Sequence, residues 1–129
     1  MADIRVEVRK RAGGFCEYCG ISDAFVSTPF QLDLFFAEKH GGLMSLENLS
    51  RSCLDCNSFK GPNIAGRDDN QTVRLFDPRN DDWKEHFAWN GPTLSGRTSI
   101  GRATIDVLRI NLTNRIALRA SLIVEGMLP

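Results

Sequence analysis

An excess of positive charge is the first thing that this sequence lacks. Lysine and arginine total 16, aspartate and glutamate total 16, and the formal net charge is +0. Proteins that bind nucleic acid usually carry a basic excess, because phosphate contacts supply much of their affinity. The overall balance therefore argues against strong nucleic-acid binding, although it leaves room for a local basic face.

Long apolar runs and targeting signals are also absent. No run approaches the roughly 20 apolar residues that a membrane-spanning helix needs, so we expect no membrane segment. We find no secretory or lipidation signal, and the sequence therefore predicts a cytoplasmic protein. The 129 residues, 42% apolar and 25% charged, fit one soluble domain over residues 1–129 with a modest core.

Cysteine is scarce, but its four copies are ordered. They form two Cys-x-x-Cys pairs, separated by the 33 residues 20–52, at Cys16, Cys19, Cys53 and Cys56. Such pairs are typical of a four-thiolate zinc site, in which each pair forms one knuckle and the metal closes the chain between them. Two disulfides or four unrelated core cysteines are the alternatives. Disulfides would need an oxidising compartment, which the sequence does not indicate.

The elements around the cysteines can be predicted from residue patterns. Asp3 can cap a first helix with Ile4, Val8 and Ala12 on one face, and its arginines and lysine form either a solvated face or a phosphate-contacting patch. Residues 30–36 are rich in strand formers. A second short strand is predicted at 48–52 and a short helix at 53–60, stopped by Gly61 and Pro62.

Beyond this region the sequence predicts a polar loop, a short strand at 73–76 and then three helices. Residues 62–71 are polar and predict an exposed loop. Asp81 is a candidate cap for a helix that runs through Phe87. Thr98 or Ser99 can cap a further helix, whose inward-facing residues would be Ile100, Thr104, Val107 and Leu108. We expect a last helix capped by Asn114, with an apolar face formed by Ile116, Leu118, Leu122 and Ile123.

These motifs together resemble the HNH endonuclease family, in the branch whose ββα-metal core is stapled by a four-cysteine zinc. The residues that carry the resemblance lie at 11–19, 40–42, 48–49, 53–61, 75–79, 83–87 and 101–105. The resemblance implies an α+β fold with a zinc-stapled ββα-metal core at about 11–62. The residue patterns above add an N-terminal helix and a C-terminal helical extension over about 63–129.

The resemblance implies a candidate active site at Asp33, His40, Asn48 and Asn57. Asp33 and Asn57 match the residues that hold one Mg²⁺ or Mn²⁺ ion, whose role is to neutralise the scissile phosphate, and their oxygens suit such ions. Asn48 matches the residue that orients the general-base histidine or braces the loop. As plain alternatives, Asn57 and Asn48 can bond backbone groups and Asp33 can pair with a Lys or Arg.

One position departs from the family. Leu34 stands where the first motif histidine, the general base, belongs. A general base contributes roughly 10² to 10⁴ in rate and leucine accepts no proton, so we expect phosphodiester hydrolysis to be lost or weak. His40 resembles a second family element near the turn rather than a relocated base. We expect His86 to be structural, and Lys60 to contact phosphate or to favour the end of its helix.

Three functions remain open. The first is a divergent HNH protein that still engages DNA. The second is an HNH scaffold recruited to another reaction, with a small organic ligand in an apolar pocket floored by Leu34. The third is a non-catalytic, zinc-stabilised module that binds nucleic acid or protein. A basic face around the first helix and Lys60 would favour the first, a pocket at Leu34 the second, and the absence of both the third.

Overall fold

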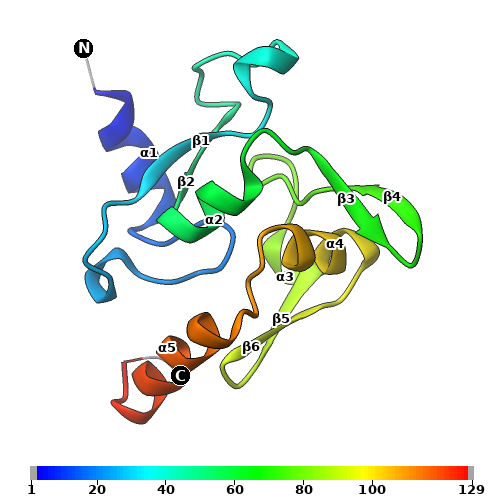
Figure 1. The fold of residues 1–129 in the computed structure, drawn as a ribbon. Helices are drawn as coiled ribbons and strands as arrows, with labels where there is room; N and C mark the ends of the chain where they lie inside the picture. The colour runs from blue at the N-terminus through cyan, green and yellow to red at the C-terminus, as the bar shows by residue number, and fades with distance from the viewer. Residues whose placement is uncertain (1–2, 128–129) are drawn as a thin grey trace.

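The structure is a computed structural model that describes residues 3–127 (Figure 1). Its first half contains the predicted ββα unit. Strands β1 (Gln31–Leu34) and β2 (Leu49–Ser52) pair antiparallel, with Asp33 opposite Ser50. Helix α2 (Leu54–Lys60) follows β2 directly and packs against both strands. The predicted strands, the helix and the α+β class are confirmed, with each strand shorter than expected.

The N-terminal helix α1 (Ile4–Ala12) is also confirmed. The Asp3 carboxylate accepts a hydrogen bond of 2.9 Å from the Arg5 N–H and caps the first turn. The helix ends at Gly13, whose φ of 66° suits a residue without a side chain. Val8 is buried where α1 packs against β2, so the helix covers one side of the ββα unit (Figure 1). A short 3₁₀ turn, η1 (Asp23–Phe25), follows the first cysteine pair.

The rest of the chain builds two hairpins around helix α4 (Ser99–Val107). They are β3 (Ala65–Asp68) with β4 (Gln71–Arg74), and β5 (Phe87–Asn90) with β6 (Thr93–Gly96). Helix α4 packs against both hairpins and is capped, as predicted, by the Thr98 hydroxyl. A Cβ at Gly101 would lie 2.1 Å from the His86 carbonyl oxygen, so glycine allows α4 to approach this closely. The C-terminal extension is therefore mixed rather than helical alone.

The predicted loop at 62–71 is wrong, because it contains strand β3. Asp69 and Asn70 both have positive φ, at 48° and 65°, and they form the two-residue turn that joins β3 to β4. This hairpin is mostly exposed, so its residues are polar and show no buried face. Strand β3 has the composition of a loop, which is why the sequence pattern missed it, whereas the strand predicted at 73–76 overlaps β4.

Helix α3 (Trp83–His86) is shorter than the predicted helix, and Asp82 rather than Asp81 caps it. Asp81 instead receives two hydrogen bonds from the Arg74 guanidinium, at 2.7 and 2.9 Å. The ring centroids of Trp83 and Phe87 lie 5.2 Å apart, so the two side chains contact each other.

Helix α5 (Thr113–Val124) is present, but its buried face differs from the expected one. Leu118 is 40% exposed, whereas Arg115, Arg119 and Leu122 are buried. Asn114 does not cap the helix, because it lies inside α5 and Leu112, two residues earlier, stands at the cap position. The surface under α5 offers carbonyl oxygens and cysteine sulfurs, and arginine donors satisfy these acceptors where leucine would not.

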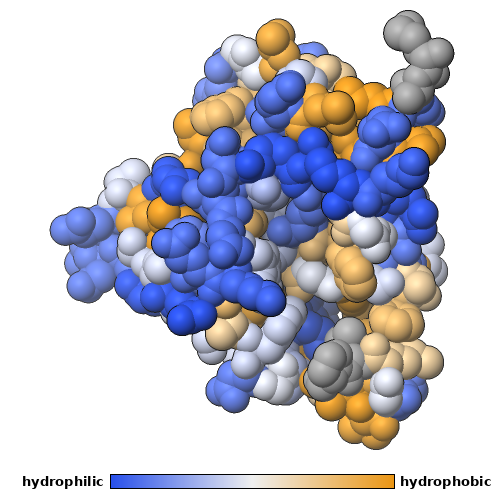
Figure 2. All heavy atoms as spheres, turned by 180° about the vertical axis from the view of Figure 1, so that it is seen from behind, coloured by the Kyte–Doolittle hydropathy of each residue, from blue (hydrophilic) through white to orange (hydrophobic). Residues whose placement is uncertain are grey.

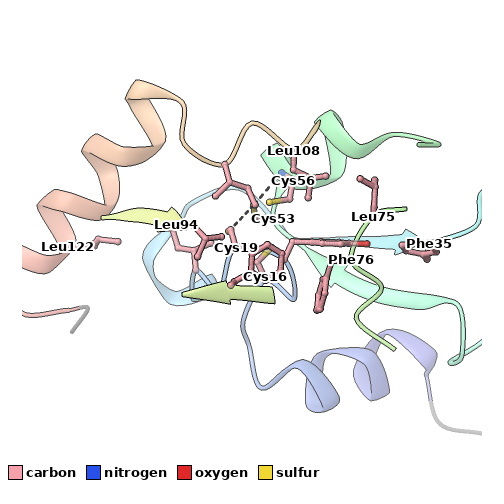
Figure 3. Close-up of a cluster of buried hydrophobic side chains, with 14 residues drawn as sticks. Cys16, Cys19, Phe35, Cys53, Cys56, Leu75, Phe76, Leu94, Leu108 and Leu122 are labelled. Atoms are coloured by element: carbon pink, nitrogen blue, oxygen red, sulfur yellow. Dashed lines mark hydrogen bonds between the residues drawn. The ribbon is translucent and has the colours of Figure 1, made fainter. Parts of the chain in front are cut away.

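The core runs between the first cysteine pair and the C-terminal elements. Phe76 packs edge-on against Tyr18 and Phe87, with centroid distances of 6.3 and 5.2 Å. The Trp83 indole N–H donates to the Tyr18 carbonyl oxygen at 2.8 Å. Figure 3 shows how the cysteines and Phe76 form one cluster with Leu94 and Leu108. Among the described residues, no helix has the length and apolar character to cross a bilayer.

Candidate metal centre and active-site positions

The four cysteines converge within the buried cluster that Figure 3 draws. Their sulfur atoms all lie within 4.8 Å of one another, and the Cys19 and Cys53 sulfurs are 3.8 Å apart. All four side chains are buried and free. No other group of three or more His, Cys, Asp or Glu side chains within residues 3–127 is close enough to hold an ion.

Each Cys-x-x-Cys pair folds in the same way. The Cys19 N–H points to the Cys16 sulfur and the Cys56 N–H to the Cys53 sulfur, both at 3.5 Å. The first pair continues into Gly20, whose φ of 77° lets its N–H bond the Cys16 carbonyl at 2.9 Å. The second pair opens helix α2. Two amide donors therefore face the sulfurs and stabilise thiolate charge.

The sulfur geometry fits a metal better than disulfides. In a tetrahedral site with metal–sulfur bonds near 2.3 Å, neighbouring sulfurs are separated by about 3.8 Å. The distance between the Cys19 and Cys53 sulfurs has this value, whereas a disulfide brings two sulfurs to about 2.05 Å. Four buried thiolates with no open position are the ligand set of a closed structural zinc site. The cysteines are thus placed to bind a metal ion, as predicted.

Arg115 adds a cation to this centre that the sequence pattern did not reveal. One of its terminal nitrogens, Nη2, is 3.1 Å from the Cys56 sulfur and 3.8 Å from the Cys53 sulfur. Burial lowers the pKa of Arg115, but the charges of Cys56 and Cys19 outweigh burial and raise it above its ordinary value. The signal available in the sequence was the spacing of Arg115, Arg119 and Leu122, which places two arginines on one buried stripe.

Asp33, the candidate metal-binding acid, is buried and already has two partners. The Tyr18 hydroxyl donates to its carboxylate at 2.7 Å, and the Lys60 ammonium lies 3.7 Å from the same oxygen. Burial raises the pKa of Asp33, while the Lys60 charge acts in the opposite direction. The alternative in which Asp33 pairs with a lysine therefore describes this structure.

Lys60 is fully buried, so the hypothesis that it contacts phosphate is wrong. Its ammonium donates to the Phe35 carbonyl at 3.0 Å and lies 5.0 Å from the Phe35 ring centroid. Burial lowers the pKa of Lys60, and the Asp33 charge opposes that shift. Lys60 thus supplies charge to the inside of the ββα unit and not to its surface.

The other motif residues lie apart from this pair. Leu34 follows Asp33 along β1, so its half-buried side chain is on the opposite face of the hairpin. Asn57 is half-buried on α2, and its side chain makes no hydrogen bond to any described residue. The predicted Mg²⁺ or Mn²⁺ site at Asp33 and Asn57 stays a prediction.

Asn48 braces the long loop between β1 and β2. Its side chain accepts from the Phe36 N–H at 2.9 Å and donates to the Phe36 and Leu43 carbonyls at 3.0 Å. At Gly42 a Cβ would lie 1.5 Å from the Phe36 carbonyl oxygen, so only glycine fits beneath this brace. Of the two roles expected for Asn48, the loop contacts match the brace.

The two histidines differ in environment. His40 ends the 3₁₀ turn η2 (Glu38–His40) and is exposed. His86 is buried, with its Nδ1 2.6 Å from the Thr98 hydroxyl oxygen, in keeping with the structural role expected for it.

Cavities open on the surface beside the cysteines, but the candidate active-site residues Asp33, His40, Asn48 and Asn57 line none of the three described next. A cavity of about 360 Å³ borders Cys53 and Arg115, one of about 530 Å³ borders Phe25 and Trp89, and one of about 620 Å³ borders Arg11. The ligand pocket predicted at Leu34 has no counterpart among these three.

The comparisons with known proteins give one match, and it covers the four cysteines and the candidate active-site residues. Residues 16–63 match the model of the HNH endonuclease family. The HNH segment, as we call residues 16–63, covers less than half of the chain and includes both cysteine pairs, β1, β2 and α2. No curated protein and no solved structure matches the chain. The resemblance to the HNH family is thus confirmed over the segment that builds the metal centre.

Proposed function

We propose that this chain is an HNH-family protein that has lost phosphodiester hydrolysis and binds DNA without cutting it. The observation that carries the proposal is the state of the former base and metal positions in the HNH segment. Leu34 accepts no proton, and the Asp33 carboxylate is engaged by Tyr18 and Lys60. The general base that the family's reaction needs is therefore missing, and the acid that would bind its metal ion is occupied by other partners.

We further propose that the four cysteines hold one structural Zn²⁺. Cys16, Cys19, Cys53 and Cys56 supply four thiolates and leave no position for substrate, so the ion's contribution is to staple the two knuckles together. Four reduced thiols are most stable in a reducing compartment, and we place the protein in the cytoplasm on that chemical ground.

Helix α1 is the surface that supports DNA binding. Arg5, Arg9 and Lys10 are exposed on it, although Arg9 also pairs with Asp23 at 3.2 Å. This is a small basic face on a chain of zero net charge. We therefore expect weak, sequence-independent and strongly salt-dependent binding.

The experiment has two arms, plasmid nicking with Mg²⁺ or Mn²⁺ and DNA binding by fluorescence anisotropy at low salt. We expect no nicking by the native chain and none by Leu34→His, because the histidine alone does not free Asp33 from Lys60. Nicking by the native chain would overturn the proposal. Nicking by Leu34→His but not by the native chain would show that Leu34 is the sole cause of the lost activity and that Asp33 is still able to bind a metal ion.

The binding arm uses charge variants of α1. Arg5→Gln with Lys10→Gln should weaken binding and reduce the salt slope by about one for each DNA phosphate that the variant no longer neutralises. Arg102→Gln is the matched control, since Arg102 is exposed on α4 and paired with Asp68. Equal effects from the two sets would argue against α1 as the DNA-binding surface.

Protein binding is the second candidate, and the loop between β1 and β2 favours it. This loop exposes Leu43 and Met44, at 72% and 61%, and Figure 2 shows apolar side chains gathered at the end of the molecule where Figure 1 draws the loop. If anisotropy shows no DNA binding even at low salt, protein binding replaces DNA binding as the proposed function. Sedimentation of the native chain beside Leu43→Ser then tests self-association through the loop.

A further inference from the structure

The thiolate cluster poses an electrostatic problem that the metal alone does not solve. Four thiolates around one divalent ion carry two net negative charges. Each of the four cysteines is at most 7% exposed, so water does little to screen them. A buried charge of this kind is costly unless a cation or hydrogen-bond donors accompany it.

Arg115 meets this need from outside the HNH segment. Its side chain is 6% exposed, and Nη2 lies 3.1 Å from the Cys56 sulfur and 3.8 Å from the Cys53 sulfur. Both sulfurs belong to the second knuckle. N–H groups directed at a ligand sulfur orient it and stabilise its negative charge.

The remaining nitrogens of Arg115 fix where Nη2 points. Nη1 donates to the Leu108 carbonyl at 2.8 Å and to the Arg109 carbonyl at 3.3 Å, just after helix α4. Nε lies 3.8 Å from the Asp55 carboxylate. Because the guanidinium is planar and rigid, these contacts hold Nη2 against the sulfurs. One side chain thus connects α5, the end of α4 and the second knuckle.

We propose that Arg115 is a positioning residue of the zinc centre, which donates hydrogen bonds to the Cys56 and Cys53 thiolates and couples metal binding to the docking of helix α5. The inference rests on the proposed zinc. It concerns a residue that lies outside the residues matched by the family model.

Arg119 provides a matched control one turn further along α5. It is buried to a similar degree and donates to the Pro92 carbonyl at 2.6 Å and the Ile110 carbonyl at 2.9 Å. Its remaining hydrogen bond, 3.3 Å long, goes to the Asn111 side-chain oxygen. Arg119 therefore shares the docking role of Arg115, but within the described residues it donates to no cysteine sulfur.

The experiment compares the native chain with Arg115→Met and Arg119→Met. Methionine keeps similar volume and flexibility in a buried position while it removes the charge and the donors. Zinc affinity is measured by competition with a chromophoric chelator. The same proteins loaded with Co²⁺ report the thiolate environment through the sulfur-to-cobalt charge-transfer band, and thermal melting reports folding.

We expect Arg115→Met to lower zinc affinity by about 10-fold to 100-fold and to shift the charge-transfer band. Arg119→Met should lower the melting temperature as much while the band stays where it is in the native chain. If the two variants lose zinc affinity equally and neither shifts the band, Arg115 only docks the helix and the inference is overturned. If the native chain binds no zinc, the zinc proposal itself fails, and this outcome is distinct from the other two.

Discussion

Two buried polar clusters in the HNH segment balance their negative charge in different ways. The metal centre gathers four cysteine sulfurs within 4.8 Å, with Arg115 as the one cation that touches them among the described residues. The second cluster has one carboxylate, Asp33 on β1, beside the ammonium of Lys60, which lies one turn after Cys56 on α2. The first has one chain cation beside four sulfurs that are placed to bind an ion from solution, whereas the second has one chain cation for one carboxylate.

The difference teaches which of the two clusters has more to gain from a metal ion. A buried anion is stable only with a cation or donors close by. At the cysteines that requirement favours metal uptake. The Asp33 carboxylate already has Lys60 as its cation and Tyr18 as its donor, so it has less to gain from a divalent ion.

Of the changes that test this comparison, removal of the metal should lower the stability of the fold most. Structural zinc in small domains contributes about 10–16 kcal/mol, more than the usual stability of a domain of this size. Excess chelator, or Cys56→Ser, should therefore unfold the HNH segment, with loss of near-ultraviolet circular dichroism and of cooperative melting. One zinc per chain in elemental analysis is the accompanying control. An unchanged melting temperature in chelator would contradict the metal centre.

The Lys60→Met variant should have the next largest effect. It leaves Asp33 buried without its cation, and loss of one partner of a buried pair costs about 3–5 kcal/mol. Denaturant unfolding measures the change in the free energy of unfolding. The double variant Lys60→Met with Asp33→Asn should recover much of the loss, because the uncompensated charge is gone.

Lys39→Met is the control for Lys60→Met, because Lys39 is exposed in the turn η2. Its effect should stay within about 0.5 kcal/mol. If Lys60→Met were equally mild, or if the double variant were no better than the single one, the two side chains would not form an energetically coupled pair.

The Tyr18→Phe variant should have the smallest effect of the three. It removes the 2.7 Å hydrogen bond to Asp33 and keeps the ring that packs against Phe76. Hydrogen bonds to charged groups contribute roughly 1.5–3 kcal/mol, and Lys60 remains in place. Unfolding by denaturant should rank this variant between the native chain and Lys60→Met. The reverse order would mean that Tyr18, and not Lys60, is the main partner of Asp33.

Much of the HNH segment could be predicted from the sequence because its signals are local. The Cys-x-x-Cys spacing located the metal centre. Outside the segment, Asp3 located the start of α1 in the same way. The distant partners could not be predicted. Nothing near Lys60 in the sequence marks it as a buried partner of Asp33, and no pattern places Arg115 beside Cys56. Strand β3 was missed for another reason, since its exposure alternates along the strand but it has no buried apolar residue to mark the side that faces α4.

The contact between Arg115 and Cys56 has a consequence for the order of assembly. The two residues are 59 positions apart in the chain. During synthesis all four cysteines leave the ribosome well before Arg115. The nascent chain can therefore bring its cysteines together before the arginine that contacts them has been synthesised. The Arg115 contact forms only after α5 has been made and has docked beside the β5–β6 turn, where Arg119 donates to the Pro92 carbonyl, so the second knuckle gains its last partner late in synthesis.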